Sequence, residues 1–204
     1  MPSAPPSLPR KRGRPRAFDP TLAIEAARPL FAARGYDRVS LTDLTGAMGI
    51  NPPSFYAAFG CKATLFTRIL DSYAQSWNAD IARCFAAATP LPETLAAILD
   101  RAILRITPEN GHNHRQRGGC MLMEAGQNCS DAIVGEYIRK ARLTLAESLS
   151  QQIAEREPER AAALTDYMMA QLAGLSAMAR DGASRDQLQA VAQVASAAIA
   201  QLPS

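Results

Sequence analysis

The sequence predicts an all-α protein, with an N-terminal three-helix domain that holds a helix-turn-helix and a larger helical domain after it. Two observations carry this prediction. Apolar residues recur at the three- and four-residue spacing of amphipathic helices along most of the chain, and we find no strand pattern of length. Residues 40–62 also hold two short helical patterns joined by a glycine. We place the helix-turn-helix domain at 17–66 and the second domain at 67–204, after a disordered basic arm at 1–16.

The helix-turn-helix is indicated by signals at the ends of its two helices. Ser40 is a good N-cap, and Asp43 three residues later resembles the partner in a capping box. Gly49 is placed to take the left-handed conformation that ends this helix. Asn51 can cap the next helix, and Pro52 suits its first position because the N–H that proline lacks is unpaired there anyway. Two short helices around a glycine turn are the arrangement that places a recognition helix in the DNA major groove.

The other helices follow from the same periodicity and from proline and glycine signals. A first helix is expected from its N-cap Asp19 to Arg34, with Gly35 beyond it, and it would complete the three-helix domain. The helices expected after the helix-turn-helix span roughly residues 62–85, 92–106, 120–125, 131–156, 158–180 and 184–202.

Composition excludes several classes of protein. A chain of 204 residues that is 48% hydrophobic can bury a core and is not mostly disordered. No apolar run approaches the length of about 18 residues that a membrane span needs, and the charged N-terminus lacks the apolar stretch of a secretory signal. The four cysteines lack the spacing of a disulfide framework, so we expect free thiols in a reducing cytoplasm.

Positive charge is concentrated in the first part of the chain. Residues 1–77 carry 10 Lys+Arg against 5 Asp+Glu, and residues 78–204 carry 12 against 14, which gives +5 and −2 and sums to the formal +3. The arm ends in a basic cluster made of Arg10, Lys11, Arg12, Arg14 and Arg16. Such an arm is expected to follow the DNA backbone or to enter the minor groove. The alternative is a solvated tail that adds only non-specific attraction.

The last two predicted helices lack the charged face of an ordinary surface helix. Asp166 is the only charged residue between positions 161 and 179, and there is none from 187 to 204. A second buried face would explain this composition. We therefore expect these helices to form a four-helix homodimer interface with the same helices of a second subunit. The alternative is a pair of core helices that the subunit covers itself.

The N-terminal segment is closely similar to the DNA-binding region of the tetracycline-repressor (TetR/AcrR) family. The resemblance covers roughly residues 17–70. Its matching features are Leu30-Phe31, Gly35-Tyr36, Ser40, Gly49-Ile50, Ser54-Phe55-Tyr56, Phe59 and Lys62 followed by Leu65. It implies a cytoplasmic DNA-binding transcriptional regulator, most simply a homodimeric repressor that a small-molecule effector releases from an inverted-repeat operator.

The resemblance also implies which residues contact DNA. Thr42 matches a position that contacts the DNA backbone, while Pro53, Ser54 and Tyr56 lie in or near the first turn of the recognition helix. Ser54 and Tyr56 can donate hydrogen bonds to phosphate oxygens, and Ser54 is within reach of a base edge. Lys62 opens the next helix, where a positive charge and free backbone N–H groups suit a phosphate.

Three positions depart from the family pattern. Ala57 and Ala58 stand where relatives often carry polar or aromatic side chains, so Ala57 offers DNA only a methyl group that can touch thymine. Sequence preference is therefore expected to rest partly on DNA shape. Cys61 replaces the usual serine or asparagine cap, and it is either a reactive thiol of lowered pKa or an inert substitution.

In this family the second domain encloses a small-molecule pocket. The residues that the resemblance suggests for its lining are aromatic or methionine: Trp77, Phe85, Met121, Met123, Tyr137, Tyr167, Met168 and Met169. The alternative is that such residues at helical spacing form plain core.

Other functions are weighed against this one. A redox sensor of the same fold would act through Cys120 or Cys129, and a metal sensor would use His112, His114 and the same two thiols. The spacing of these residues matches no zinc pattern, so no metal and no cofactor is expected. The chain has two histidines, no glycine-rich phosphate loop and no nucleophile with an evident base, which argues against an enzyme.

Overall fold

The computed structural model describes residues 19–107, 118–124 and 129–201, and every regular element in these ranges is a helix. The all-α prediction is therefore confirmed. The expected arm at 1–16, with Arg12, Arg14 and Arg16, lies outside the described residues, as do His112 and His114. None of the helices in the described ranges is both long enough and apolar enough to span a membrane.

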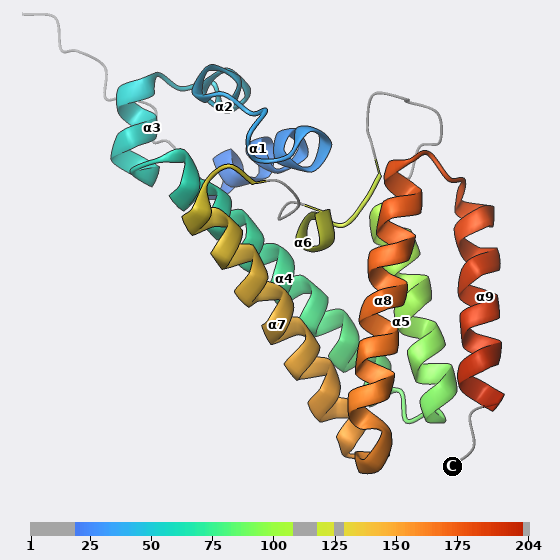
Figure 1. Ribbon diagram of the computed structural model, residues 1–204. Coiled ribbons are helices and arrows are strands. Elements are labelled where there is room, and N and C mark those ends of the chain that lie inside the picture. The colour runs from blue at the N-terminus through green and yellow to red at the C-terminus, as the bar shows by residue number, and fades with distance from the viewer. Residues whose placement is uncertain (1–18, 108–117, 125–128, 202–204) are drawn as a thin grey trace, which may run out of the picture.

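Three short helices form the N-terminal head, by which we mean residues 19–61 (Figure 1). Helix α1 spans Pro20–Arg34, α2 spans Leu41–Met48 and α3 spans Pro52–Phe59. The predicted caps are present: Ser40 and Asp43 form the reciprocal capping box, and Gly49 is left-handed with φ 65°. The side chain of Asn51 accepts a hydrogen bond from the backbone N–H of Ser54 at 2.9 Å. These local bonds pair backbone N–H and C=O groups that would otherwise be unpaired at the helix ends, and they hold α2 and α3 at a tight turn.

Helix α4, Lys62–Ala86, joins the head to the rest of the protein. It crosses the predicted domain boundary at residue 66 without a break. The ring of Phe66 packs at 4.9 Å from Phe31 and 5.1 Å from Tyr36, measured between ring centroids. The first turns of α4 are therefore part of the core of the head.

The remaining helices make up the C-terminal body, by which we mean the described residues from 91 to 201. They are α5 Leu91–Ile106, α6 Met121–Glu124, α7 Ala132–Ala154, α8 Ala161–Arg180 and α9 Arg185–Gln201, with a 3-10 turn at Pro158–Arg160. Helices α4 and α7 run side by side, α8 packs on α7, and α5 packs against α9 (Figure 1). The sequence placed most ends within two residues. The exception is α8, which was expected from Pro158, whereas a separate 3-10 turn precedes it.

Candidate nucleic-acid interface and regulatory site

The first turn of α3 presents a solvent-facing surface. Phe55 and Phe59 are buried and anchor the helix in the head. On its other face Pro53, Tyr56 and Ala57 are exposed and Ser54 is half-buried. Tyr56 is 52% exposed, so both its ring and its hydroxyl are accessible to a partner. The candidate DNA-contacting residues of α3 thus lie together on one accessible side.

Helix α2 supplies the second part of this surface. Thr42 is exposed in its first turn, whereas Leu44 and Thr45 are buried. The N-terminus of α2 is fixed by the capping box and by an ion pair of Arg34 with Asp43 at 3.1 Å. Thr42 therefore projects from a helix end whose position is set by three separate contacts.

Lys62 is held inside the head to a greater extent than the sequence suggested. Its ammonium donates to the carbonyl oxygens of Tyr36 at 3.2 Å and Val39 at 3.0 Å. It also lies 4.1 Å from the centroid of the Tyr36 ring. Lys62 thus joins the N-terminus of α4 to the connection between α1 and α2, a role that the sequence did not reveal.

The net positive charge of this end of the protein resides on the arm. Of the 10 Lys+Arg in residues 1–77, five lie in residues 1–16, which contain no acidic residue. The other five are balanced in number by the five Asp+Glu in residues 19–77. The head itself is therefore close to neutral by formal charge.

Cys61 is the exposed N-cap of α4. Hydrogen bonds with the hydroxyl and the backbone N–H of Thr64 lower the pKa of the Cys61 thiol below its usual value. The Cys61 side chain therefore serves as the cap of this helix.

The predicted ligand-lining residues do not all lie around one space. Trp77, Phe85, Met121, Met123 and Met168 are buried. Phe85 lies at the far end of α4, where the guanidinium of Arg156 covers its ring at 5.2 Å. Two further members are partly exposed: Tyr137 donates a hydrogen bond to Asp71, and Tyr167 lines an open groove. Met169 is half-buried.

A polar cluster lies beside Trp77. The hydroxyl of Tyr73 donates to the thiol of Cys120 at 3.4 Å, and the guanidinium of Arg105 lies 5.1 Å from the Trp77 ring and 5.9 Å from the Tyr73 ring. The indole N–H of Trp77 is buried and makes no hydrogen bond of full geometry within the described part of the chain, although it lies close enough to the Tyr73 hydroxyl and the Cys120 thiol to favour the ionised form of each. Arg105 in turn pairs with the buried Asp80. A buried donor without an acceptor costs free energy, so this position suits a water molecule or a ligand with an acceptor oxygen.

Helix α6 is fixed to α8 by a buried network. The hydroxyl of Ser176 donates to Glu124 at 2.9 Å and accepts the backbone N–H of Cys120 at 2.7 Å. Arg180 pairs with the other carboxylate oxygen of Glu124 at 2.8 Å. These three polar residues were not predicted from the sequence, since no local pattern shows that positions over 50 apart meet.

Two cysteines considered as sensors are not activated thiols in this structure. Burial raises the pKa of Cys120 and also that of Cys129. A thiol of raised pKa carries little thiolate, which is the reactive form. Within the described ranges no three His, Cys, Asp or Glu side chains are grouped so that they could hold a metal ion.

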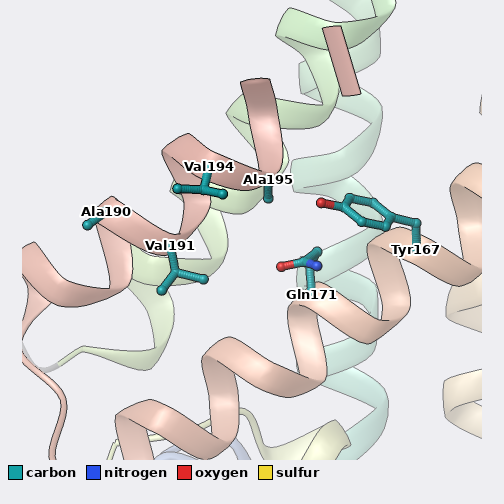
Figure 2. A pocket seen from close by; sticks show the side chains of 6 residues that line it. All are labelled: Tyr167, Gln171, Ala190, Val191, Val194 and Ala195. Atoms are coloured by element: carbon teal, nitrogen blue, oxygen red, sulfur yellow. The ribbon is translucent and has the colours of Figure 1, made fainter. Parts of the chain in front are cut away.

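An open groove of about 450 Å³ lies between α8 and α9. Figure 2 shows Tyr167 and Gln171 from α8 on one side and Val191, Val194 and Ala195 from α9 on the other. Val194 is 72% exposed although it is apolar. Small residues of α8, including Gly174, are exposed as well.

Comparisons with known proteins agree with this architecture. The sequence profile of the bacterial regulatory proteins of the tetR family matches residues 23–69. The HTH-type transcriptional repressor BdcR of Escherichia coli (strain K12) is 40% identical over 194 residues, 93% of each chain. The HTH-type transcriptional repressor ComR of the same organism is 27% identical over 200 residues, 90% of each chain.

A solved structure extends the comparison to three dimensions. A cysteine mutant of the TetR family regulator CifR, in complex with 26-base-pair operator DNA, is 30% identical with a TM-score of 0.78. The match covers 91% of this chain and 99% of that chain. A helix-turn-helix head carried by a helical bundle defines a class of DNA-binding transcription regulators. Within that class, the chain belongs to the TetR family of bacterial transcriptional regulators, as its identity with BdcR over most of both chains shows.

Proposed function

We propose that the protein is a homodimeric repressor, which binds an inverted-repeat operator in the cytoplasm and is released by a small-molecule effector. The observation that carries the proposal is the exposed first turn of α3, where Tyr56 stands free of the core. Both full-length relatives named above are repressors, and CifR was solved on operator DNA. The relatives belong to a class that acts by binding and not by catalysis.

DNA recognition is assigned to the exposed side of α2 and α3 and to the arm. Thr42, Ser54 and Tyr56 offer hydroxyl groups to phosphate oxygens, and Pro53 and Ala57 offer apolar contacts to the groove. Lys62 has a third N–H left after its two carbonyl bonds, and this donor suits a phosphate. Because the head is nearly neutral, Arg12, Arg14 and Arg16 of the arm supply most of the attraction to the DNA backbone.

The effector is assigned to the polar cluster beside Trp77. Cys120 leads into α6 with its buried Met121 and Met123, and the indole N–H of Trp77, which makes no hydrogen bond of full geometry, can bind an acceptor oxygen of the effector. A redox-sensing repressor that acts through Cys120 or Cys129 is less well supported, because burial raises the pKa of both thiols.

The test is a selection of duplexes from a random DNA pool by the purified protein, followed by binding titrations. The wild type is expected to recover an inverted repeat with half-sites about one helical turn apart. Tyr56→Ala should weaken binding to the recovered duplex about 10-fold or more, as a lost hydrogen bond to DNA together with its packing would. Leu104→Ala is the matched control, since Leu104 on α5 is equally exposed at 51% and should leave affinity unchanged. Recovery of no sequence by the wild type, or of sequences without two-fold symmetry, would contradict the proposal.

A further inference from the structure

The head makes a second connection to the C-terminal body, besides helix α4. The hydroxyl of Tyr36 donates to Asp131 at 3.1 Å. Asp37 accepts two hydrogen bonds from Ser130, one from its hydroxyl at 2.6 Å and one from its backbone N–H at 3.1 Å. We call these three bonds the α7 contact, because Ser130 and Asp131 form the turn before α7 and Asp131 is its N-cap.

The α7 contact restricts a swing of the head relative to α7, which a connection through α4 alone would allow. The head and the first turns of α4 share one aromatic core, so they move as a unit. Further along, α4 and α7 pack side by side, and Tyr137 of α7 binds Asp71 of α4. If α4 flexes between the head and Asp71, the α7 contact opposes the swing with hydrogen bonds, beside the apolar core that continues from the head into the rest of the described residues.

The bonds of the α7 contact are directional. A hydrogen bond prefers angles above about 150° and weakens steeply below about 120°, whereas apolar packing has no such directional limit. Three such bonds on adjacent residues therefore narrow the range of angles that the head can take relative to α7. Asp37 is a carboxylate in this arrangement, because the hydrogen bond from the Ser130 hydroxyl lowers its pKa.

We infer that Tyr36 and Asp37 are specificity-determining residues, which set the spacing of operator half-sites that the dimer accepts. This inference rests on the proposed dimeric repressor. B-DNA rises about 3.4 Å and turns about 35° per base pair, so one inserted base pair displaces a half-site in both distance and angle. A head held at one angle cannot follow that displacement, whereas a head attached through α4 alone can.

The experiment uses the operator recovered by the wild type and two further duplexes, with one base pair added or removed between the half-sites. Wild type should bind both altered duplexes about 30-fold or more weakly than the operator, the loss expected when base contacts of one half-site fail. The double variant Tyr36→Phe/Asp37→Ala should reduce that ratio to about 5-fold or less, because its heads adapt. The readout is the ratio of affinities, since the change in net charge that comes with the loss of a carboxylate alters all three affinities alike.

The control variant is Glu136→Ala, which removes an exposed carboxylate of α7 that pairs with Arg139 outside the α7 contact. It should keep the wild-type ratio. The inference is overturned if the double variant keeps the wild-type ratio. This includes the case in which it binds all three duplexes more weakly by the same factor. Should the double variant not fold, Ser130→Ala removes one bond from an exposed side chain and supports the same comparison. Failure of the proposed function differs from both results, because the wild type would then recover no operator.

Discussion

Single residues in this protein hold the parts of the head together through charge-assisted bonds. Lys62 is the clearest case, since its ammonium binds two backbone carbonyls and an aromatic face. Those carbonyls belong to the α1–α2 connection, which also carries Tyr36 and Asp37. The residue that the family resemblance marks as a phosphate contact therefore also stabilises the segment that reaches α7.

Replacement of Lys62 by alanine should have two separable effects. It should lower the free energy of unfolding by about 1 to 2 kcal/mol, because hydrogen bonds to a charged group and a cation–π contact are lost. It should also reduce the slope of log affinity against log salt by about 1, the value of one phosphate contact. Urea unfolding and operator titrations over a salt series measure the two effects. A lower stability with an unchanged salt slope would remove Lys62 from the DNA surface and leave only its structural role.

Asp80 illustrates a buried charge that depends on its partners. Burial opposes its ionisation, but bonds and charges from Arg105 and Arg83 outweigh that effect and lower its pKa. Because the folded pKa lies below the unfolded value of about 3.9, the pair stabilises the fold above that pH, and the stabilisation is lost as pH falls through the folded pKa.

Replacement of Asp80 by asparagine should therefore cost stability in a pH-dependent way. At pH 7 we expect a loss of about 2 to 4 kcal/mol, since Arg105 is left partly buried without its carboxylate. The difference from wild type should shrink as pH falls below about 4, where the wild-type carboxyl is also protonated. Denaturant unfolding at pH 7, 5 and 3.5 gives the comparison. Asp100→Asn, at an exposed position on α5, should stay within about 0.5 kcal/mol of wild type. A deficit that is constant across pH would show that the charge of Asp80 is not the cause.

At the level of elements, the sequence predicted the helices well because their ends are set locally. Ser40, Gly49 and Asn51 act on neighbours within three residues, and the structure confirms each of these caps. The start of α8 was misplaced because Pro158 also suits the 3-10 turn that precedes the helix. Contacts between distant segments left no such signal, and the network of Glu124, Ser176 and Arg180 appeared only in the structure.

Gly118 and Gly119, just before α6, occupy positions that no other residue type fits without strain. A Cβ atom on Gly118 would stand 2.6 Å from the carbonyl oxygen of Ile106 and 3.0 Å from that of Ala179. Both neighbours are backbone atoms of helix ends, so neither can move aside as a flexible side chain would. The next residue, Gly119, has φ 119° and donates to the carbonyl of Ile106. The two glycines thus let the chain pass between α5 and α8.

Replacement of Gly118 by alanine should lower the free energy of unfolding by about 2 kcal/mol or more, because overpacking against backbone forces α6 to shift. Gly135→Ala is the matched control. Gly135 lies inside α7 with no atom within 4 Å of its added Cβ, and alanine there should raise stability by up to about 1 kcal/mol. Thermal and urea unfolding of the two variants should move in opposite directions. Equal stability of Gly118→Ala and wild type would show that the segment has room to relax.

For the whole molecule, the family resemblance is more informative about the exposed side of α3 than about the effector site. The resemblance named the residues of α3 that lie on its exposed side, since the recognition helix is short and its register follows from buried Phe55 and Phe59. It was less informative for the effector site. Trp77 and Met168 are buried while Tyr167 faces an open groove, because apolar periodicity does not distinguish core from pocket or from interface.

Helices α8 and α9 leave an open apolar face on the subunit. Val194 is 72% exposed beside the groove that Tyr167 lines, and a soluble protein rarely leaves such an apolar face open. Val194→Arg should place an unpaired charge in the proposed interface at a cost of several kcal/mol. Ala195 is less suitable for this test, because it is buried within its own subunit. Light scattering should show a dimer for wild type and a monomer for Val194→Arg, and the monomer should lose tight operator binding because one head makes half the contacts. Leu143→Arg, at an exposed position on α7, should remain dimeric. A dimeric Val194→Arg variant that binds the operator normally would place the interface elsewhere.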